Sequence, residues 1–166
     1  MIQSDIKKIV EDLVQTFLDA GKISLNLRRK GLTKEIKSDN TPVSNGDLEV
    51  NKILTKKILD LTPNISIVSE EASENKTRDN LENFWLIDPI DGTYDYINDL
   101  DEFTINAGLI IQKKPVAGLI YAPAKNRMFY SYGDDFSFEL INGEPIKLGN
   151  SKNFDKNEIK FVSYSK

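Results

Sequence analysis

The apolar residues at the start of the chain recur every three to four positions. From Ile6 onward they form the stripe of an amphipathic helix, which predicts a helix over residues 2–29 that stops at Gly31. A second helix is predicted over residues 44–61, with Pro63 just after its end. The ordinary role of both stripes is packing against a core.

After residue 64 the apolar pattern changes to short alternating runs, which are separated by turn residues such as Asn142 and Gly143. One further strand is predicted earlier, before a polar loop over residues 38–42. The predicted strands span residues 33–37, 65–68, 84–87, 104–111, 115–121, 128–132, 136–141 and 159–164. Two helices followed by a series of strands predict an α+β fold, with the helices against one face of a largely antiparallel sheet.

The composition restricts the chemistry that the chain can perform. Its 166 residues suffice for one domain with a real core. There is no cysteine, which excludes disulfides and thiolate metal sites, and no histidine, the commonest general base and transition-metal ligand. Any chemistry must therefore come from aspartate, glutamate, lysine, tyrosine and hydroxyl groups.

Charge and hydropathy narrow the expected partners. The net charge is −4, with 26 acidic and 22 basic residues and no basic stripe, which argues against a nucleic-acid polymer as partner. No apolar run approaches the length of a membrane span, and no leader-like apolar segment begins the chain. We therefore expect a cytoplasmic protein that does not bind membranes.

Acidic residues stand at the ends of three predicted elements: Asp47 in SNGDLEVN, Glu70 and Glu71 in IVSEEAS, and Asp88 and Asp91 in LIDPIDGT. Each has an ordinary explanation when it is taken alone. Asp47 can cap the second helix, the glutamates can be solvated surface charge, and the last two aspartates can be turn formers.

The LIDPIDGT segment is the least ordinary of the three. Its two carboxylates follow four apolar residues, where they repel each other unless a cation lies between them. The proline between them turns the backbone, so that Asp88, the Ile90 carbonyl and Asp91 can face one ion. Oxygen ligands alone select Mg²⁺, Mn²⁺ or Ca²⁺. Gly92 and Thr93 then lead into a predicted short helix whose free amides can receive a phosphate.

Two other sites with aspartate-rich loops do not fit the spacing. An EF-hand would place acidic residues two and four positions before Asp91, where Pro89 and Ile87 stand. A haloacid-dehalogenase-type phosphatase has aspartates two positions apart in DxDGT, whereas Ile90 occupies the required place here. That similarity is superficial.

The motifs together resemble those of the magnesium-dependent, lithium-sensitive inositol monophosphatase superfamily, which has counterparts of WLIDPIDGT, VSEEAS and SNGDLEVN in the same order and spacing. Residues 101–130 and the segment KSDNTPVSNGDLEVN are most similar to its CysQ branch, the 3'(2'),5'-bisphosphate nucleotidases. The resemblance covers residues 1 to about 148. It implies a layered αβαβα sandwich, whose first half would be the helix pair and sheet.

The resemblance also implies a role for each matched residue. The implied metal ligands are Glu70, Asp88, Asp91 and the Ile90 carbonyl, with Asp88 bridging two ions. Asp47 and Thr93 would hold and activate the attacking water, with Glu70 as a further catalytic residue. Asp91, Gly92 and Thr93 would contact the substrate, the last two through backbone amides.

The implied activity is hydrolysis of a small phosphate monoester by water, assisted by two or three Mg²⁺ ions in the complete enzyme. The CysQ-like segments point to 3'-phosphoadenosine 5'-phosphate as substrate. An inositol phosphate or a range of sugar phosphates is the alternative, because the metal machinery is shared. A non-catalytic binding or assembly remnant is a second alternative, because an open sheet edge can pair with another chain. A homodimer is also among the expected assemblies.

One departure from the family concerns the later part of the chain. Members run to roughly 250 residues or more, and a later Trp-Asp motif supplies a further ligand, whereas the only tryptophan here is Trp85. We expect residues 1–150 to form an N-terminal α+β metal-binding domain. We expect residues 151–166 to begin a C-terminal α/β domain that is missing, so that this form is incomplete and weakly active or inactive.

Overall fold

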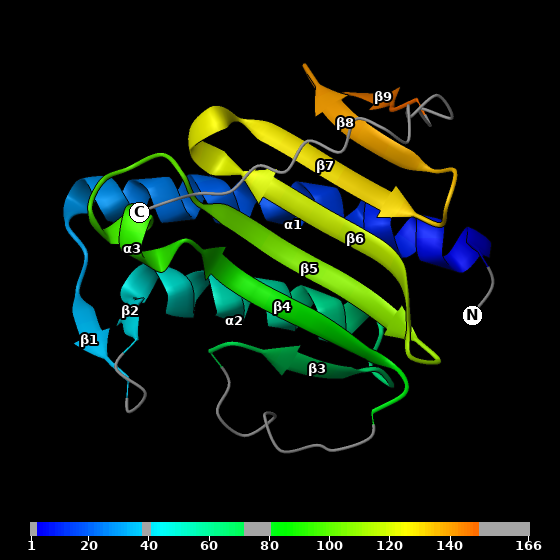
Figure 1. Ribbon diagram of the computed structural model, residues 1–166, viewed down its shortest axis with the longest axis horizontal. Helices are drawn as coiled ribbons and strands as arrows, with labels where there is room; N and C mark the ends of the chain where they lie inside the picture. The colour runs from blue at the N-terminus through cyan, green and yellow to red at the C-terminus, as the bar shows by residue number, and fades with distance from the viewer. Residues whose placement is uncertain (1–2, 38–40, 72–80, 150–166) are drawn as a thin grey trace, which may run out of the picture.

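The protein consists of two long helices that precede a seven-stranded sheet, and the computed structural model describes residues 3–37, 41–71 and 81–149 (Figure 1). The long helices are α1 (Gln3–Lys30) and α2 (Asn45–Leu61). In spatial order the strands are β3 (Ser66–Ser69), β4 (Phe84–Asp91), β5 (Thr104–Ile111), β6 (Lys114–Ala122), β7 (Arg127–Tyr132), β8 (Ser137–Ile141) and β9 (Glu144–Lys147). The predicted α+β class is confirmed.

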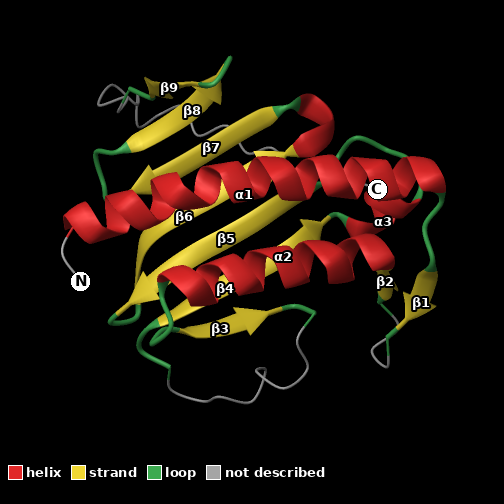
Figure 2. Cartoon of the chain, turned by 180° about the vertical axis from the view of Figure 1, so that it is seen from behind, coloured by secondary structure: helices red, strands yellow, loops and turns green. Residues whose placement is uncertain are grey.

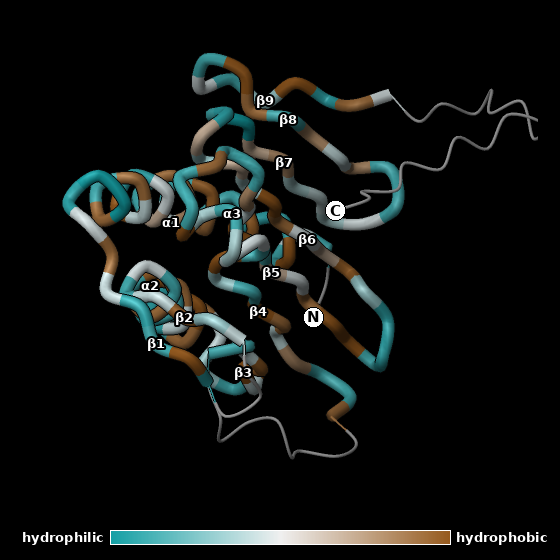
Figure 3. Tube along the Cα trace, turned by 60° about the vertical axis from the view of Figure 1, so that its left-hand side comes forward, coloured by the Kyte–Doolittle hydropathy of each residue, from teal (hydrophilic) through white to brown (hydrophobic). Residues whose placement is uncertain are grey.

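Both long helices cover the same face of the sheet. Viewed from behind, α1 crosses β6 and β7 while α2 lies over β4 (Figure 2), and the side view places both helices together (Figure 3). The apolar stripes predicted from the sequence form the core between the layers, with Leu13, Phe17 and Leu54 fully buried. Trp85 of β4 is also fully buried, and its indole Nε1 donates to Thr62 Oγ1 at 3.1 Å.

One strand pair breaks the antiparallel pattern in a way that matters for the site. β3 pairs with β4 in parallel, whereas every other neighbouring pair in this sheet is antiparallel. Because parallel strands end at the same edge, the residues that follow β3 lie beside the last residues of β4. The predominantly antiparallel sheet was predicted, but its single parallel pair was not.

The predicted end of β4 at residue 87 is wrong. The strand continues to Asp91, and its register with β5 shifts between Asp88 and Asp91. Pro89 lies within this irregular stretch, where a residue without an N–H is tolerated because the regular ladder is interrupted. The backbone therefore changes course inside the strand and not in a loop after it.

Other boundaries differ less. The predicted short strand is β1 (Lys34–Ile36), but its partner β2 (Pro42–Ser44) begins at Pro42, which lies in the predicted polar loop. β9 was not predicted from the sequence, because the strand has only four residues and all of them are exposed. The predicted short helix after Gly92 is α3 (Thr93–Ile97), and a 3-10 helix, η2 (Pro123–Lys125), connects β6 to β7. The strand predicted over residues 159–164 lies outside the described residues.

None of the helices within the described ranges has both the length and the apolarity needed to span a bilayer.

Candidate active site

The acidic residues singled out in the sequence come together at the C-terminal end of β4. Asp47 lies in the first turn of α2, Glu70 directly follows β3, and Asp88 and Asp91 lie in the last part of β4. The Glu70 backbone N–H donates to the Ile87 carbonyl oxygen at 3.1 Å, which continues the parallel pairing by one residue. This bond holds Glu70 beside Asp88, so that three separate elements supply one cluster.

Asp47 is both a helix cap and a link to α3. Its carboxylate Oδ2 accepts hydrogen bonds from the Ser44 N–H at 2.9 Å and the Ser44 hydroxyl at 2.6 Å, and the capping explanation is therefore confirmed. Its Oδ1 lies 3.1 Å from Thr93 Oγ1. The side chain is almost completely buried. Capping thus orients this carboxylate toward the start of α3.

The turn between β4 and α3 places Thr93 against two acceptors. Thr93 Oγ1 lies 3.0 Å from the Ile90 carbonyl oxygen as well as 3.1 Å from Asp47 Oδ1. Gly92 before it has a φ of 91°, and a Cβ at this position would lie 2.7 Å from the Glu102 carbonyl oxygen. Both the left-handed backbone and the lack of space therefore require glycine here.

Asp88 lies among the like charges of Glu70, Asp91 and Asp47. Its Oδ1 is buried and has no hydrogen-bond partner among the described residues. Burial, followed by the charges of Glu70 and Asp91, a hydrogen bond with Glu70 and the charge of Asp47, raises the pKa of Asp88 to about 7. A carboxylate in these surroundings is suited to binding a cation.

Asn106 was not predicted from the sequence, although it lies directly opposite Asp88 on β5. Its Nδ2 donates to Asp91 Oδ2 at 3.3 Å, while its Oδ1 is buried without a partner among the described residues. Only the β4–β5 register reveals this neighbour, because eighteen residues separate it from Asp88 in the sequence.

Lys37 is a second residue that the sequence did not single out. Its Nζ lies 2.6 Å from Glu71 Oε1 and 3.9 Å from Glu70 Oε1. The interpretation of Glu71 as solvated charge is wrong, because its side chain is only 4% exposed. Burial raises the pKa of Glu71 despite the lysine. Burial opposes the charge of Lys37, but the hydrogen bond to Glu71 and the nearby carboxylates outweigh it and raise the pKa of Lys37.

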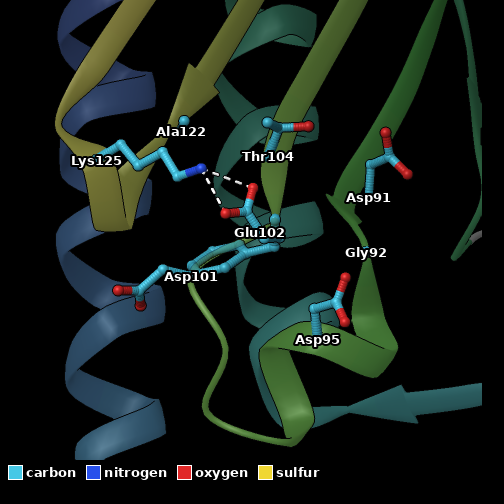
Figure 4. A pocket seen from close by; sticks show the side chains of 9 residues that line it. Asp91, Gly92, Asp95, Asp101, Glu102, Thr104, Ala122 and Lys125 are labelled. Carbon is cyan, nitrogen blue, oxygen red and sulfur yellow. Dashed lines mark hydrogen bonds and ion pairs between the residues drawn. The ribbon is translucent and has the colours of Figure 1, made fainter. Parts of the chain in front are cut away.

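A cavity of about 330 Å³ opens beside Asp91 and Gly92 (Figure 4). Asp95, Asp101 and Thr104 contribute to its lining. Across it, Lys125 Nζ lies 2.6 Å from both carboxylate oxygens of Glu102. The cavity gives a small molecule room next to the end of β4.

The loop that lines this cavity is held by α1. Arg28 donates to the Leu100 carbonyl oxygen at 2.7 Å and pairs with Asp101 at 2.9 Å, and its guanidinium also lies over the ring of Phe103. The arginine side chain is only 13% exposed. These contacts fix the loop relative to the helical layer.

The donor set fits a hard divalent cation. Glu70, Asp88, Asp91 and the Ile90 carbonyl offer only oxygen, and the unpartnered Asp88 oxygen is available as a ligand. Within residues 3–37, 41–71 and 81–149, however, no three acidic side chains already form a group that could hold a metal ion. The residue types fit Mg²⁺. The carboxylate side chains, however, would have to move closer together to bind the ion.

Comparison with known proteins identifies the same family that the acidic motifs indicate. The model of the inositol monophosphatase family matches residues 5–165. The chain belongs to the inositol monophosphatase family. This confirms the resemblance drawn from the three acidic motifs, and it accounts for the α+β arrangement around the end of β4.

Among curated members of the family, 3'(2'),5'-bisphosphate nucleotidase CysQ of Haemophilus influenzae is 37% identical over 140 residues, which are 82% of this chain and 52% of that protein. CysQ of Buchnera aphidicola is 33% identical over 145 residues, which are 86% of this chain and 55% of that protein. The chain therefore spans about half the length of the curated relatives it matches.

Solved structures of the inositol monophosphatase family share the fold. The extragenic suppressor protein SuhB of Bartonella henselae superposes with a TM-score of 0.70 at 23% identity, covering 80% of this chain and 52% of that chain. The inositol monophosphatase of Anabaena superposes with a TM-score of 0.67 at 25% identity, covering 87% and 51%. In both cases the matched part is again about half of the relative.

Proposed function

We propose that this chain provides the metal-binding half of a Mg²⁺-dependent phosphatase that removes the 3'-phosphate of 3'-phosphoadenosine 5'-phosphate. The buried, unpartnered Asp88 carboxylate among Glu70, Asp91 and Asp47 is the observation that carries the proposal. The similarity to two CysQ proteins named as 3'(2'),5'-bisphosphate nucleotidases supports the choice of substrate.

The proposed ligands of Mg²⁺ are Glu70, Asp88, Asp91 and the Ile90 carbonyl oxygen, with two or three ions in the complete enzyme. A neighbouring structure of an IMPase/NADP phosphatase, similar in fold at 20% identity, is described as complexed with Mg²⁺ and phosphate. When bound, Mg²⁺ supplies positive charge to the phosphate and to the water that attacks it.

The residues of the chain itself orient that water. Thr93 Oγ1 lies within hydrogen-bond distance of Asp47 Oδ1, so its hydroxyl proton can point at the carboxylate while its lone pairs accept from a water. The water gives its proton to Thr93 Oγ1 as the Thr93 proton passes to Asp47. Ser44 keeps Asp47 in place throughout, because its two bonds to Oδ2 leave Oδ1 facing Thr93. The Gly92 and Thr93 amides remain predicted contacts of the phosphate.

An inositol phosphate is the second candidate substrate. The fold match to the Anabaena inositol monophosphatase favours it, and the residues at the end of β4 would serve either ester.

A cytoplasmic location agrees with the absence of cysteine from all 166 residues. The homodimer stays a prediction.

The proposal is tested by phosphate release from 3'-phosphoadenosine 5'-phosphate and from inositol 1-phosphate, with and without Mg²⁺. The assay uses this chain and a form extended to the length of the relatives. We expect the extended form to prefer the nucleotide. Asp88→Asn should lower its turnover by about a thousandfold or more, since it removes a carboxylate that would hold the Mg²⁺ on which the reaction depends. Asp60→Asn, on the exposed end of α2, is the matched control.

Near-normal turnover of Asp88→Asn would contradict the site, and preference for the inositol ester would replace the substrate. High activity of the 166-residue chain would overturn the expectation that the other half is required. No Mg²⁺-dependent hydrolysis by either form would favour the non-catalytic alternative.

A further inference from the structure

Lys37 brings a partly buried positive charge to the edge of the proposed metal site. Its side chain is 19% exposed, and its Nζ lies 2.6 Å from the almost fully buried Glu71 carboxylate. The same ammonium lies 3.9 Å from Glu70 Oε1. A lysine therefore contacts both a proposed metal ligand and the acidic residue next to it.

Both partners of this ion pair are anchored by their own elements. The Lys37 backbone N–H donates to the Thr41 carbonyl oxygen at 2.9 Å, in the hairpin formed by β1 and β2. The Glu71 N–H donates to Ser69 Oγ at 3.3 Å, and the Ser69 hydroxyl donates to Asn51 Oδ1 of α2 at 2.7 Å. The ion pair thus joins the hairpin to the end of β3 at a defined place.

The charges around Lys37 explain what it does in a chain without bound metal. Glu71, Glu70 and Asp47 all act electrostatically on its ammonium. Without a cation these carboxylates would repel one another across a partly buried space, where such repulsion is weakly screened. Lys37 supplies one positive charge there and engages Glu71 directly, while Glu70 stays half exposed and only loosely paired.

We propose that Lys37 is the internal counter-ion of the metal site, which engages Glu71 and competes with Mg²⁺ for the negative charge of the cluster. This inference rests on the proposed function, because it takes Glu70 and Asp88 as metal ligands. It assigns Lys37 and Glu71 a positioning role that limits how tightly the site binds its cation.

The test is a double-mutant cycle on Mg²⁺ binding by this chain, measured by titration calorimetry and by the shift in Tm that Mg²⁺ causes. Lys37→Met should bind Mg²⁺ roughly five- to tenfold more tightly, since it removes a positive charge next to the ion. Its metal-free Tm should fall, because Glu71 is left buried without its partner. Glu71→Gln should bind Mg²⁺ more weakly than the wild type, because the full charge of Lys37 then acts on Glu70.

The double variant Lys37→Met/Glu71→Gln should return Mg²⁺ affinity to near the wild-type value, since it has the same net charge. This variant and Glu71→Gln contain no unpaired buried carboxylate at this place, so they keep the cycle readable if Lys37→Met folds poorly. Lys37→Arg should behave like the wild type. Lys52→Met, whose lysine is 76% exposed on α2, is the control and should change the affinity less than about twofold.

Equal or weaker Mg²⁺ binding by Lys37→Met, or unchanged binding by Glu71→Gln, would overturn the counter-ion role while leaving the proposed metal site intact. A wild-type chain that binds no Mg²⁺, and an extended form without Mg²⁺-dependent hydrolysis, would overturn both. The wild-type titration and the hydrolysis assay of the extended form together therefore distinguish the two failures.

Discussion

At the scale of single residues, Asp88 and Asp47 show how differently two carboxylates of one cluster are accommodated. Asp47 accepts two hydrogen bonds from Ser44 and lies 3.1 Å from the Thr93 hydroxyl. Asp88 has a buried oxygen without a partner in the described part of the chain, and its pKa is raised to about 7. The surroundings of Asp47 therefore suit binding of a hydroxyl group, and those of Asp88 suit binding of a cation.

The raised pKa of Asp88 predicts how the stability of the metal-free chain depends on pH. Its folded-state pKa of about 7 lies above the ordinary 3.8, so the folded state binds more protons between these values. The stabilising protonation is complete below the lower value and is lost as the pH rises through the higher one. In EDTA, the free energy of unfolding should fall by on the order of 1 kcal/mol between about pH 5 and 8, after allowing for solvent screening.

Asp88→Asn should remove this pH dependence and leave the metal-free chain more stable than the wild type at pH 8, as measured by urea unfolding. Asp60→Asn, an exposed residue of α2, should keep the wild-type slope. A wild-type chain whose stability is flat or rises over this range would contradict the surroundings described for Asp88.

At the scale of elements, the start of α2 depends on close contact with α3. A Cβ at Gly46 would lie 2.4 Å from the Tyr96 hydroxyl oxygen. Tyr96 is fully buried and donates to the Ser24 carbonyl oxygen of α1 at 2.7 Å. The close approach of α1, α2 and α3 around the Tyr96 ring therefore helps to set the position of Asp47, the residue after Gly46.

Gly46→Ala should therefore destabilise the chain by about 1–3 kcal/mol, the usual range for overpacking a well-filled core. Thermal unfolding measures this loss, and the turnover of the extended form should also fall because the neighbouring Asp47, which would orient the attacking water with Thr93, is displaced. Gly108→Ala is the matched control, since a Cβ there would meet no atom closer than 3.9 Å. Equal effects of the two substitutions would contradict the tight helix contact.

At the scale of the whole molecule, the sheet has one face packed against helices and one that no described helix covers (Figure 1). Trp85 and Ile87 point toward α2 and are buried, so Leu86 between them points the other way and is 51% exposed. Ile120 is likewise 50% exposed between buried neighbours on β6. Within this chain, stability should therefore come almost entirely from the helix-covered face.

Substitutions on the helix-covered face of the sheet should lower the free energy of unfolding more than substitutions on the open face. Leu119→Ala, at a fully buried position, should cost about 2–5 kcal/mol in urea unfolding, because it leaves a cavity in the core. Ile120→Ala on the next residue should cost less than about 1 kcal/mol in this chain, because its side chain is already half exposed. Comparable losses at the two positions would show that the open face is covered in solution.

The sequence alone determined the class of fold and the chemistry of the cluster. Apolar spacing is a local property, so periods of 3.6 and 2 residues revealed both helices and most strands to within a few residues. The three acidic motifs likewise identified the family, because a ligand set made only of oxygen and its order along the chain can be read from residue types. What these motifs could not reveal is which other side chains lie around the acids.

The tertiary structure decided the neighbours. Lys37 pairs with Glu71 across 34 residues, and Asn106 faces Asp88 only because of the register between β4 and β5. The parallel pairing of β3 with β4 brings Glu70 to Asp88, although the surrounding sheet is antiparallel. Such contacts join elements distant in sequence, and local periodicity carries no information about which elements pack together. The electrostatic balance of the site therefore follows from the packing and not from the motifs.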